Sequence, residues 1–127
     1  MAYVHDLVIS NRDGEALARL AAGGERGALA DLMLDSRFVA DEALPPDRMA
    51  LGTRVTYAED PGSAMRTVTL VAPADADAAA GRISVLSPIG LALIGRRRGA
   101  LTDAHLPNGR HLRLRVLEAA APVAAVS

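Results

Sequence analysis

The sequence predicts an α+β fold, in which a short N-terminal antiparallel helical hairpin precedes an antiparallel β-sheet with one short helix. The apolar pattern carries this prediction. Before Pro46, apolar residues recur at the spacings of three and four that indicate helices, and after it they alternate with polar residues as in half-buried strands. Of the 127 residues, 50% are apolar and 23% are charged, a composition that suits one folded domain and is unlike a disordered chain.

The first helix is expected to follow Ser10. Ser10 is a favourable N-cap, and Asp13 falls in the first turn, where the helix dipole favours an acidic side chain. One apolar stripe then continues the helical spacing: Leu17, Leu20 and Ala21.

The glycines between 23 and 27 are expected to end that helix and form a turn. A second helix should follow and end before Pro45-Pro46, because a residue that precedes proline is driven out of the helical conformation. Its apolar face would hold Leu29, Leu32, Met33 and Ser36. With about 11 to 14 residues each, the two helical arms would be only roughly 16 to 21 Å long.

Strands are predicted from Arg54 to Tyr57 and from Thr67 to Leu70, joined by a turn at Glu59–Gly62. An acidic, alanine-rich connector, Pro73–Gly81, offers one helical turn before a third strand at Arg82–Val85. The short helix then begins with Ser87 as cap and Pro88 at its first position, and Gly95 closes it. The sheet is completed by a weaker strand near Leu101, a turn at Pro107–Gly109 and a strand from His111 to Val116.

Strand alternation divides the sheet residues into two faces. The covered face should hold Val55, Tyr57, Val68, Leu70, Ile83, Val85, Leu112, Leu114 and Val116. The open face should be polar and basic, with Arg54, Thr56, Thr67, Thr69, Arg82, Ser84, His111, Arg113 and Arg115. Such a face is either the solvated side of an antiparallel sheet or a surface for a partner.

Charge is distributed unevenly. Residues 1–47 carry a net charge of −5 and residues 48–127 carry +4, and all fourteen basic residues are arginine. The chain has no cysteine, which excludes disulfides, thiolate metal sites and a cysteine nucleophile. No apolar run approaches the roughly 20 residues that span a bilayer. The first fifteen residues include Asp6, Asp13 and Glu15, whereas a signal peptide would be basic and then apolar there. We therefore expect a cytoplasmic protein with no membrane contact.

Two motifs resemble the C-terminal domain of the GreA/GreB transcription elongation factors. The first is Gly81–Gly95, with Arg82-Ile83-Ser84 followed by Ser87-Pro88-Ile89, and the second is Leu106–Arg110. The resemblance implies an FKBP-like fold for residues 47–120. The helical hairpin occupies residues 1–46, and the composition of residues 121–127, rich in Ala, Val and Pro, indicates a flexible tail. The resemblance also implies docking on RNA polymerase at the rim of the secondary channel.

The N-terminal half and Pro46–Val55 resemble the short Rnk branch of this family, the regulators of nucleoside diphosphate kinase. Gly90 also looks like that branch, because Gre factors commonly have alanine there. Leu86 departs from the Asp or Asn that Gre factors usually carry before Ser-Pro, which puts details of docking in doubt.

The hairpin tip departs further. Gre factors present an acidic pair on a long coiled coil, which helps to hold a second Mg²⁺ for transcript cleavage. Here the tip is Gly24-Glu25-Arg26, and one carboxylate beside one guanidinium is a poor Mg²⁺ donor. We therefore expect a polymerase binder that competes with cleavage factors and is not itself an enzyme. The alternative is a true cleavage factor in which Glu25 holds the metal with help from a substrate phosphate.

The residues expected to dock are Ser87, Pro88, Ile89, Arg96, Arg97 and Arg98. The arginine run has a second interpretation, a solvated loop that compensates the helix dipole. A homodimer formed through the hairpin stripe also remains open. The aromatic residues are Tyr3, Phe38 and Tyr57, too few for base stacking or for the proline pocket of an isomerase.

No cofactor or metal is expected. The histidines, at 5, 105 and 111, are scattered in the sequence and have no accompanying pattern of metal ligands.

Overall fold

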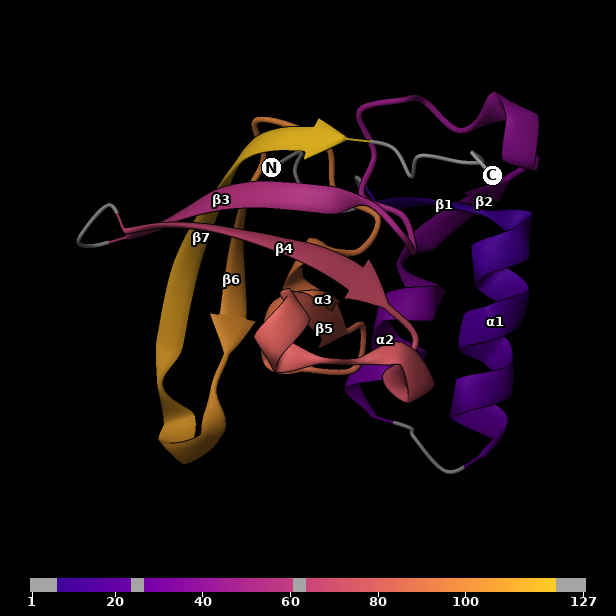
Figure 1. Ribbon diagram of the computed structural model, residues 1–127. Coiled ribbons are helices and arrows are strands. Elements are labelled where there is room, and N and C mark those ends of the chain that lie inside the picture. The colour runs from indigo at the N-terminus through magenta and orange to yellow at the C-terminus, as the bar shows by residue number, and fades with distance from the viewer. Residues whose placement is uncertain (1–6, 24–26, 61–63, 121–127) are drawn as a thin grey trace.

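A curved five-stranded sheet partly surrounds one short helix, α3 (Pro88–Leu93), and α1 (Asn11–Ala22) and α2 (Ala28–Leu34) lie to one side (Figure 1). The computed structural model describes residues 7–23, 27–60 and 64–120. The strands follow the order β5-β4-β3-β7-β6. Their bounds are β3 Arg54–Asp60, β4 Met65–Val71, β5 Arg82–Ser84, β6 Leu101–His105 and β7 His111–Ala120. The predicted α+β class is confirmed.

The N-terminal helices begin as predicted but differ in length. The side chain of Ser10 accepts a hydrogen bond from the backbone N–H of Asp13 and so caps α1. With 12 residues, α1 is about 18 Å long, whereas the 7 residues of α2 span only about 10 Å. The expected extension of the second helix through Ser36 is wrong, because residues 36–39 form a strand instead.

That strand, β2 (Ser36–Val39), pairs in parallel with β1 (Leu7–Ser10), which the apolar pattern did not predict. All four residues of β1 are buried. Pairing with this buried strand overrides the helical spacing of residues 29–36, and Phe38 and Val39 suit a strand. In the chain, both helices therefore lie between two strands that are hydrogen-bonded to each other.

The sheet is mixed, not antiparallel throughout as predicted. Strand β5 pairs in parallel with β4 because two 3-10 turns, Pro73–Asp75 and Ala78–Ala80, carry the chain back between them. These replace the single helical turn expected there. The β3–β4, β3–β7 and β6–β7 pairs are antiparallel.

The last strand is longer than predicted, and the turn before it is the predicted one. Strand β7 continues to Ala120, beyond the predicted end at Val116, and a bulge interrupts its pairing with β3 between Thr56 and Tyr57. The predicted turn at Pro107–Gly109 is present, with Asn108 at φ +74°. The expected β3–β4 turn falls partly, and the tail at 121–127 wholly, outside the described residues.

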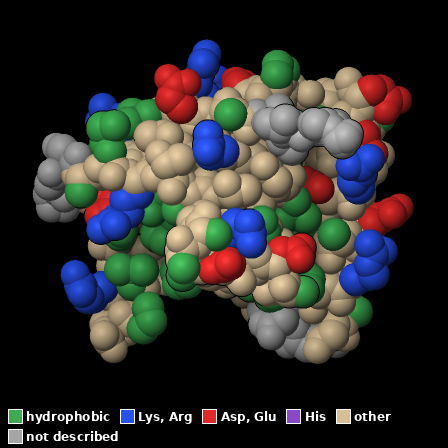
Figure 2. Space-filling model, viewed as in Figure 1, with side chains coloured by type: hydrophobic (Ala, Val, Ile, Leu, Met, Phe, Trp, Pro, Cys, Tyr) green, Lys and Arg blue, Asp and Glu red, His purple; other side chains and the backbone are tan. Residues whose placement is uncertain are grey.

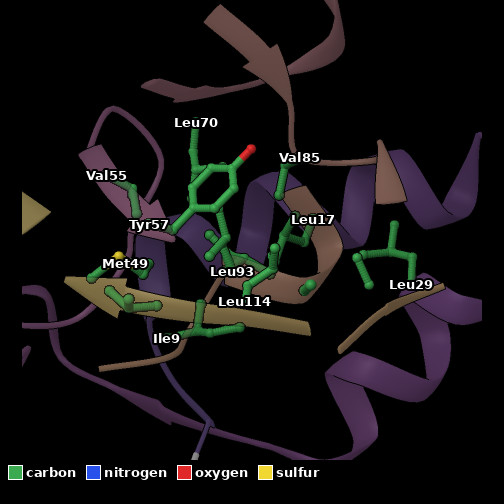
Figure 3. Close-up of a cluster of buried hydrophobic side chains, with 14 residues drawn as sticks. Ile9, Leu17, Leu29, Met49, Val55, Tyr57, Leu70, Val85, Leu93 and Leu114 are labelled. Atoms are coloured by element: carbon green, nitrogen blue, oxygen red, sulfur yellow. The ribbon is translucent and has the colours of Figure 1, made fainter. Parts of the chain in front are cut away.

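The predicted division of the sheet into two faces is confirmed. Six of the apolar residues assigned to the covered face are fully buried: Val55, Tyr57, Leu70, Val85, Leu114 and Val116. They meet side chains from the helices and from β1, among them Ile9, Leu17, Leu29 and Leu93, in one core (Figure 3). In the described part of the chain, no helix has the length and apolar character needed to cross a bilayer.

Candidate docking site

The start of α3 is fixed by hydrogen bonds around one serine. The Ser87 hydroxyl accepts from the Gly90 N–H at 3.1 Å and donates to the Ser84 carbonyl at 2.7 Å. The Leu86 N–H in turn donates to the Ser84 hydroxyl at 3.0 Å. These bonds join the end of β5 to the helix, as the predicted N-cap requires. Ser87 therefore holds the loop in place whether or not it touches a partner.

Gly90 allows the helix to approach β5 closely. A side-chain carbon at this position would fall onto the Ser84 carbonyl oxygen and lie 2.8 Å from the Cα of Val85. Pro88 and Ile89, the two residues before Gly90, are half-buried, and Ile89 packs against the core. Part of the predicted docking sequence is thus committed to packing within the protein.

The arginine run continues from α3 along a backbone seam with residues 47–49. The Met49 N–H donates to the Arg96 carbonyl at 2.8 Å, and the Arg98 N–H donates to the Asp47 carbonyl at 2.9 Å. These backbone hydrogen bonds hold the run in place beside residues 47–49. Arg96 is half-buried, whereas the side chains of Arg97 and Arg98 are exposed.

A groove of about 340 Å³ lies between α2, α3 and β6. Pro88 and Arg96 are the two predicted docking residues that line it. Ser87, Ile89, Arg97 and Arg98 lie outside its lining, so the structure does not gather all six residues in one hollow. The remaining lining residues are Leu7, Ala28, Asp31, Leu32, Asp35, Leu91, Ala92, Thr102, Asp103 and His105.

The region of α2 also contributes to this surface, although no predicted docking residue lies there. Its acidic groups are Asp31 and the C-cap residue Asp35. Their spacing of four places them on one side of a helix, which was a usable signal, but the packing of α2 beside α3 joins residues some 60 positions apart. The groove therefore combines apolar, acidic and basic groups.

The helical part is tied to the sheet at several points. The Asp13 carboxylate accepts a hydrogen bond from the Leu51 N–H at 2.9 Å, and the Val8 N–H donates to the Gly95 carbonyl at 3.0 Å. Burial raises the pKa of the Asp13 carboxyl above 3.8, although the bond from Leu51 opposes this shift. These contacts fix the base of the hairpin. Its tip, Gly24, Glu25 and Arg26, lies outside the described residues.

The open face of the sheet carries the predicted arginines, but acids accompany several of them. Arg113 pairs with Asp103 at 3.3 Å, and Arg82 pairs with Asp77 at 3.5 Å. On the side of the molecule that Figure 2 shows, arginine and acidic side chains are interleaved and form no single charged patch. Exposed pairs of this kind contribute little to stability.

Comparison with known proteins decides the family. Residues 44–121, more than half of the chain, match the family model "Transcription elongation factor, GreA/GreB, C-term". The chain belongs to the GreA/GreB family. The matched segment contains the whole five-stranded sheet, α3 and the arginine run.

Members of the GreA/GreB family resemble this chain at about one third identity. GreA of Macrococcus caseolyticus is 33% identical over 88 residues, which cover 69% of this chain and 56% of the relative. GreA of Desulfovibrio desulfuricans is 34% identical over 99 residues, 78% of this chain and 57% of the relative. This chain thus spans little more than half the length of these relatives.

A solved structure resembles the chain over almost its entire length. It is described as a prokaryotic transcription elongation factor GreA/GreB from Nitrosomonas europaea, with a TM-score of 0.73 and 29% identity. The alignment covers 91% of this chain and 98% of that one. The two chains therefore share one fold over nearly the same length.

Proposed function

We propose that this protein is a transcription regulator of the short Rnk type that binds RNA polymerase at the rim of the secondary channel. The observation that carries the proposal is the match of residues 44–121 to the GreA/GreB C-terminal domain. By its resemblance to Gre factors, this domain is the part that docks on the polymerase. The proposed partner places the protein in the cytoplasm.

The docking surface of the proposal consists of Ser87, Pro88, Ile89 and Arg96–Arg98. Two features support it. The cap at Ser87 and the backbone seam at Arg96 and Arg98 hold this surface rigid, which lowers the entropy cost of binding. The exposed guanidinium groups of Arg97 and Arg98 can meet an acidic element of the polymerase.

The proposed mechanism is competition with longer cleavage factors. Residues 47–120 dock, and the hairpin of residues 1–46 blocks the channel entrance. The short helices support a role in blocking the entrance, because α1 and α2 are about 18 and 10 Å long and cannot reach far into a channel. The protein then excludes a cleavage factor without cleaving the transcript, and it is not an enzyme.

Binding to purified core RNA polymerase, measured by co-elution with and without a competing GreA protein, tests the proposal. We expect co-elution that the competitor abolishes. Pro88→Ala combined with Arg97→Glu should weaken the complex, whereas Arg54→Glu, an exposed charge reversal on the open face of the sheet, should leave it unchanged. Equal affinity of wild type and the Pro88/Arg97 double variant would show that the docking surface is misassigned.

A second candidate function is transcript cleavage, which the GreA relatives' description as elongation factors favours. It makes a different prediction in a cleavage assay on backtracked complexes. A cleavage factor would be active and would lose activity on Glu25→Gln. The competitor that we propose would be inactive alone and would inhibit cleavage stimulated by GreA.

A further inference from the structure

Two of the three histidines face each other across the β6–β7 hairpin. His105 ends β6, His111 begins β7, and the two are direct partners in the antiparallel register. Their ring centroids are 4.5 Å apart, and the rings meet edge to face at 78°. The fold thus joins two imidazoles that five intervening residues separate in the sequence.

The loop between the histidines is closed by its own backbone. The Leu106 N–H donates to the Arg110 carbonyl at 2.8 Å, and the intervening Pro107–Gly109 turn fixes the direction of the chain. Directly opposed residues of an antiparallel pair have their Cβ atoms about 4.5 to 5.5 Å apart. The two imidazoles are therefore held near each other before any ligand binds.

The positive charge near the two histidines is partly offset, so their surroundings can accept a cation. Both histidines are exposed, so an ion and its water ligands can reach them. Arg113 lies two residues after His111, but its guanidinium Nε donates to the Asp103 carboxylate at 3.3 Å. Asp103 offsets that positive charge, and the loop itself adds one further cation, Arg110.

We propose that His105 and His111 form a two-imidazole chelate for a borderline transition-metal ion, with Cu²⁺ bound more tightly than Ni²⁺ or Zn²⁺. Metal–nitrogen bonds are about 2.0 to 2.1 Å long, so both rings reach one ion by turning from the edge-to-face arrangement. Copper leads because imidazole sites follow the general order of divalent-metal affinity.

Water completes the coordination shell at this site. Among the described residues, no group of three or more His, Asp or Glu side chains is placed to hold a metal, so the protein supplies two ligands. Mg²⁺ is excluded, because it prefers oxygen ligands. The site is open on the surface, and His105 also lines the groove that contains the docking residues Pro88 and Arg96. The metal proposal does not depend on the proposed function, because its test measures metal binding by the isolated chain.

Titration of the untagged full-length chain with Ni²⁺ and with Cu²⁺, followed by calorimetry and by the histidine ring resonances, tests the proposal. We expect one ion per chain and simultaneous perturbation of both ring systems. His105→Ala and His111→Ala should each weaken binding by more than roughly tenfold, since even outer-shell partners of metal ligands are worth that much. The matched control is His5→Ala, the third histidine, which should bind like wild type.

Thermal unfolding supplies an independent readout. Ni²⁺ should raise the Tm of wild type and of His5→Ala but not of either hairpin variant, because a ligand that binds only the folded chain stabilises it. Mg²⁺ should shift none of them. Without metal, the hairpin variants should melt close to wild type, since both side chains are exposed. Undiminished binding in His105→Ala or His111→Ala, or an equal loss in His5→Ala, would overturn the proposal.

Discussion

The Asp13 carboxylate accepts a hydrogen bond from the backbone N–H of Leu51 at 2.9 Å, which joins the first turn of α1 to the loop that leads into β3. The carboxyl group is buried, and burial raises its pKa above the ordinary value of 3.8. The bond from Leu51 and the charge of Arg12 lower the pKa, but they do not cancel the effect of desolvation. The folded chain therefore holds this proton more tightly than the unfolded chain does.

Substitutions at Asp13 should separate the charge from the hydrogen bond. Because the folded-state pKa is raised, the stabilisation from the protonated group is fully present below pH 3.8 and is lost as pH rises through the folded-state pKa. Asp13→Asn keeps an acceptor for Leu51 but does not titrate. Its free energy of unfolding, measured by urea titration, should therefore gain on wild type as pH rises across this window.

Asp13→Ala is the matched comparison, because it removes both the charge and the acceptor. It leaves the Leu51 N–H without its partner and should be less stable than Asp13→Asn by about 1 to 3 kcal/mol at neutral pH. A difference between Asp13→Asn and wild type that does not change with pH would contradict the raised pKa.

Gly90→Ala should destabilise the protein by about 1 to 3 kcal/mol, the usual cost of overpacking a tight contact. The added methyl group meets the backbone of Ser84 and Val85, which cannot rotate away as a side chain would. Gly23→Ala is the control, because an added carbon there lies 3.6 Å from its neighbours at an ordinary φ of −81°. Chemical denaturation of both variants checks this, and equal stabilities would refute the close approach.

Gly14 and Phe38 should be energetically coupled. A methyl group on Gly14 would lie 2.8 Å from the Phe38 ring, which is 38% exposed and so has room to move. Gly14→Ala should therefore be neutral or mildly destabilising in wild type. In a Phe38→Ala background it should stabilise by about 0.5 to 1 kcal/mol, because alanine favours a helix over glycine. A double-mutant cycle with zero coupling would rule out this contact.

Ser87→Ala should cost about 1 kcal/mol through the lost N-cap, as should Ser10→Ala at the start of α1. The two serines differ in their relation to the proposed docking surface, because Ser87 belongs to it and Ser10 does not. Polymerase affinity measured well below the melting temperature should fall for Ser87→Ala and stay constant for Ser10→Ala. Equal affinities would assign Ser87 to the fold alone.

Local chemistry made much of this fold predictable. Ser10 and Ser87 cap their helices through bonds to residues three positions away, and strand alternation assigned Val55 and Leu114 to the core. Pairing between distant segments was not predictable in this way. The strand at Ser36–Val39 continues a helical pattern and becomes a strand because β1, about 30 residues earlier, pairs with it.

The candidate site divides in the same way. Pro88 and Arg96 were predicted as docking residues, and both line the groove. Its acidic residues, Asp31, Asp35 and Asp103, come from α2, its C-cap and β6. The pairing of His105 with His111 likewise depends on strand register, which their spacing in the sequence leaves open. Motifs formed by residues close together in the sequence could be predicted, whereas surfaces formed by several helices and strands could be identified only in the structure.

The parallel pairing of β1 with β2 fixes where the α1–α2 arm is attached, and this attachment does not depend on the length of the helices. The chain enters α1 from Ser10 at the end of β1 and leaves α2 into Ser36 at the start of β2, which lies opposite Leu7. The two ends of the α1–α2 segment are therefore anchored at opposite ends of one hydrogen-bonded pair of strands. Seven residues added to each helix would extend the arm by about 10 Å without disturbing that anchor. The reach of the α1–α2 arm is thus set by helix length alone, whereas its attachment is set by the pairing of β1 with β2.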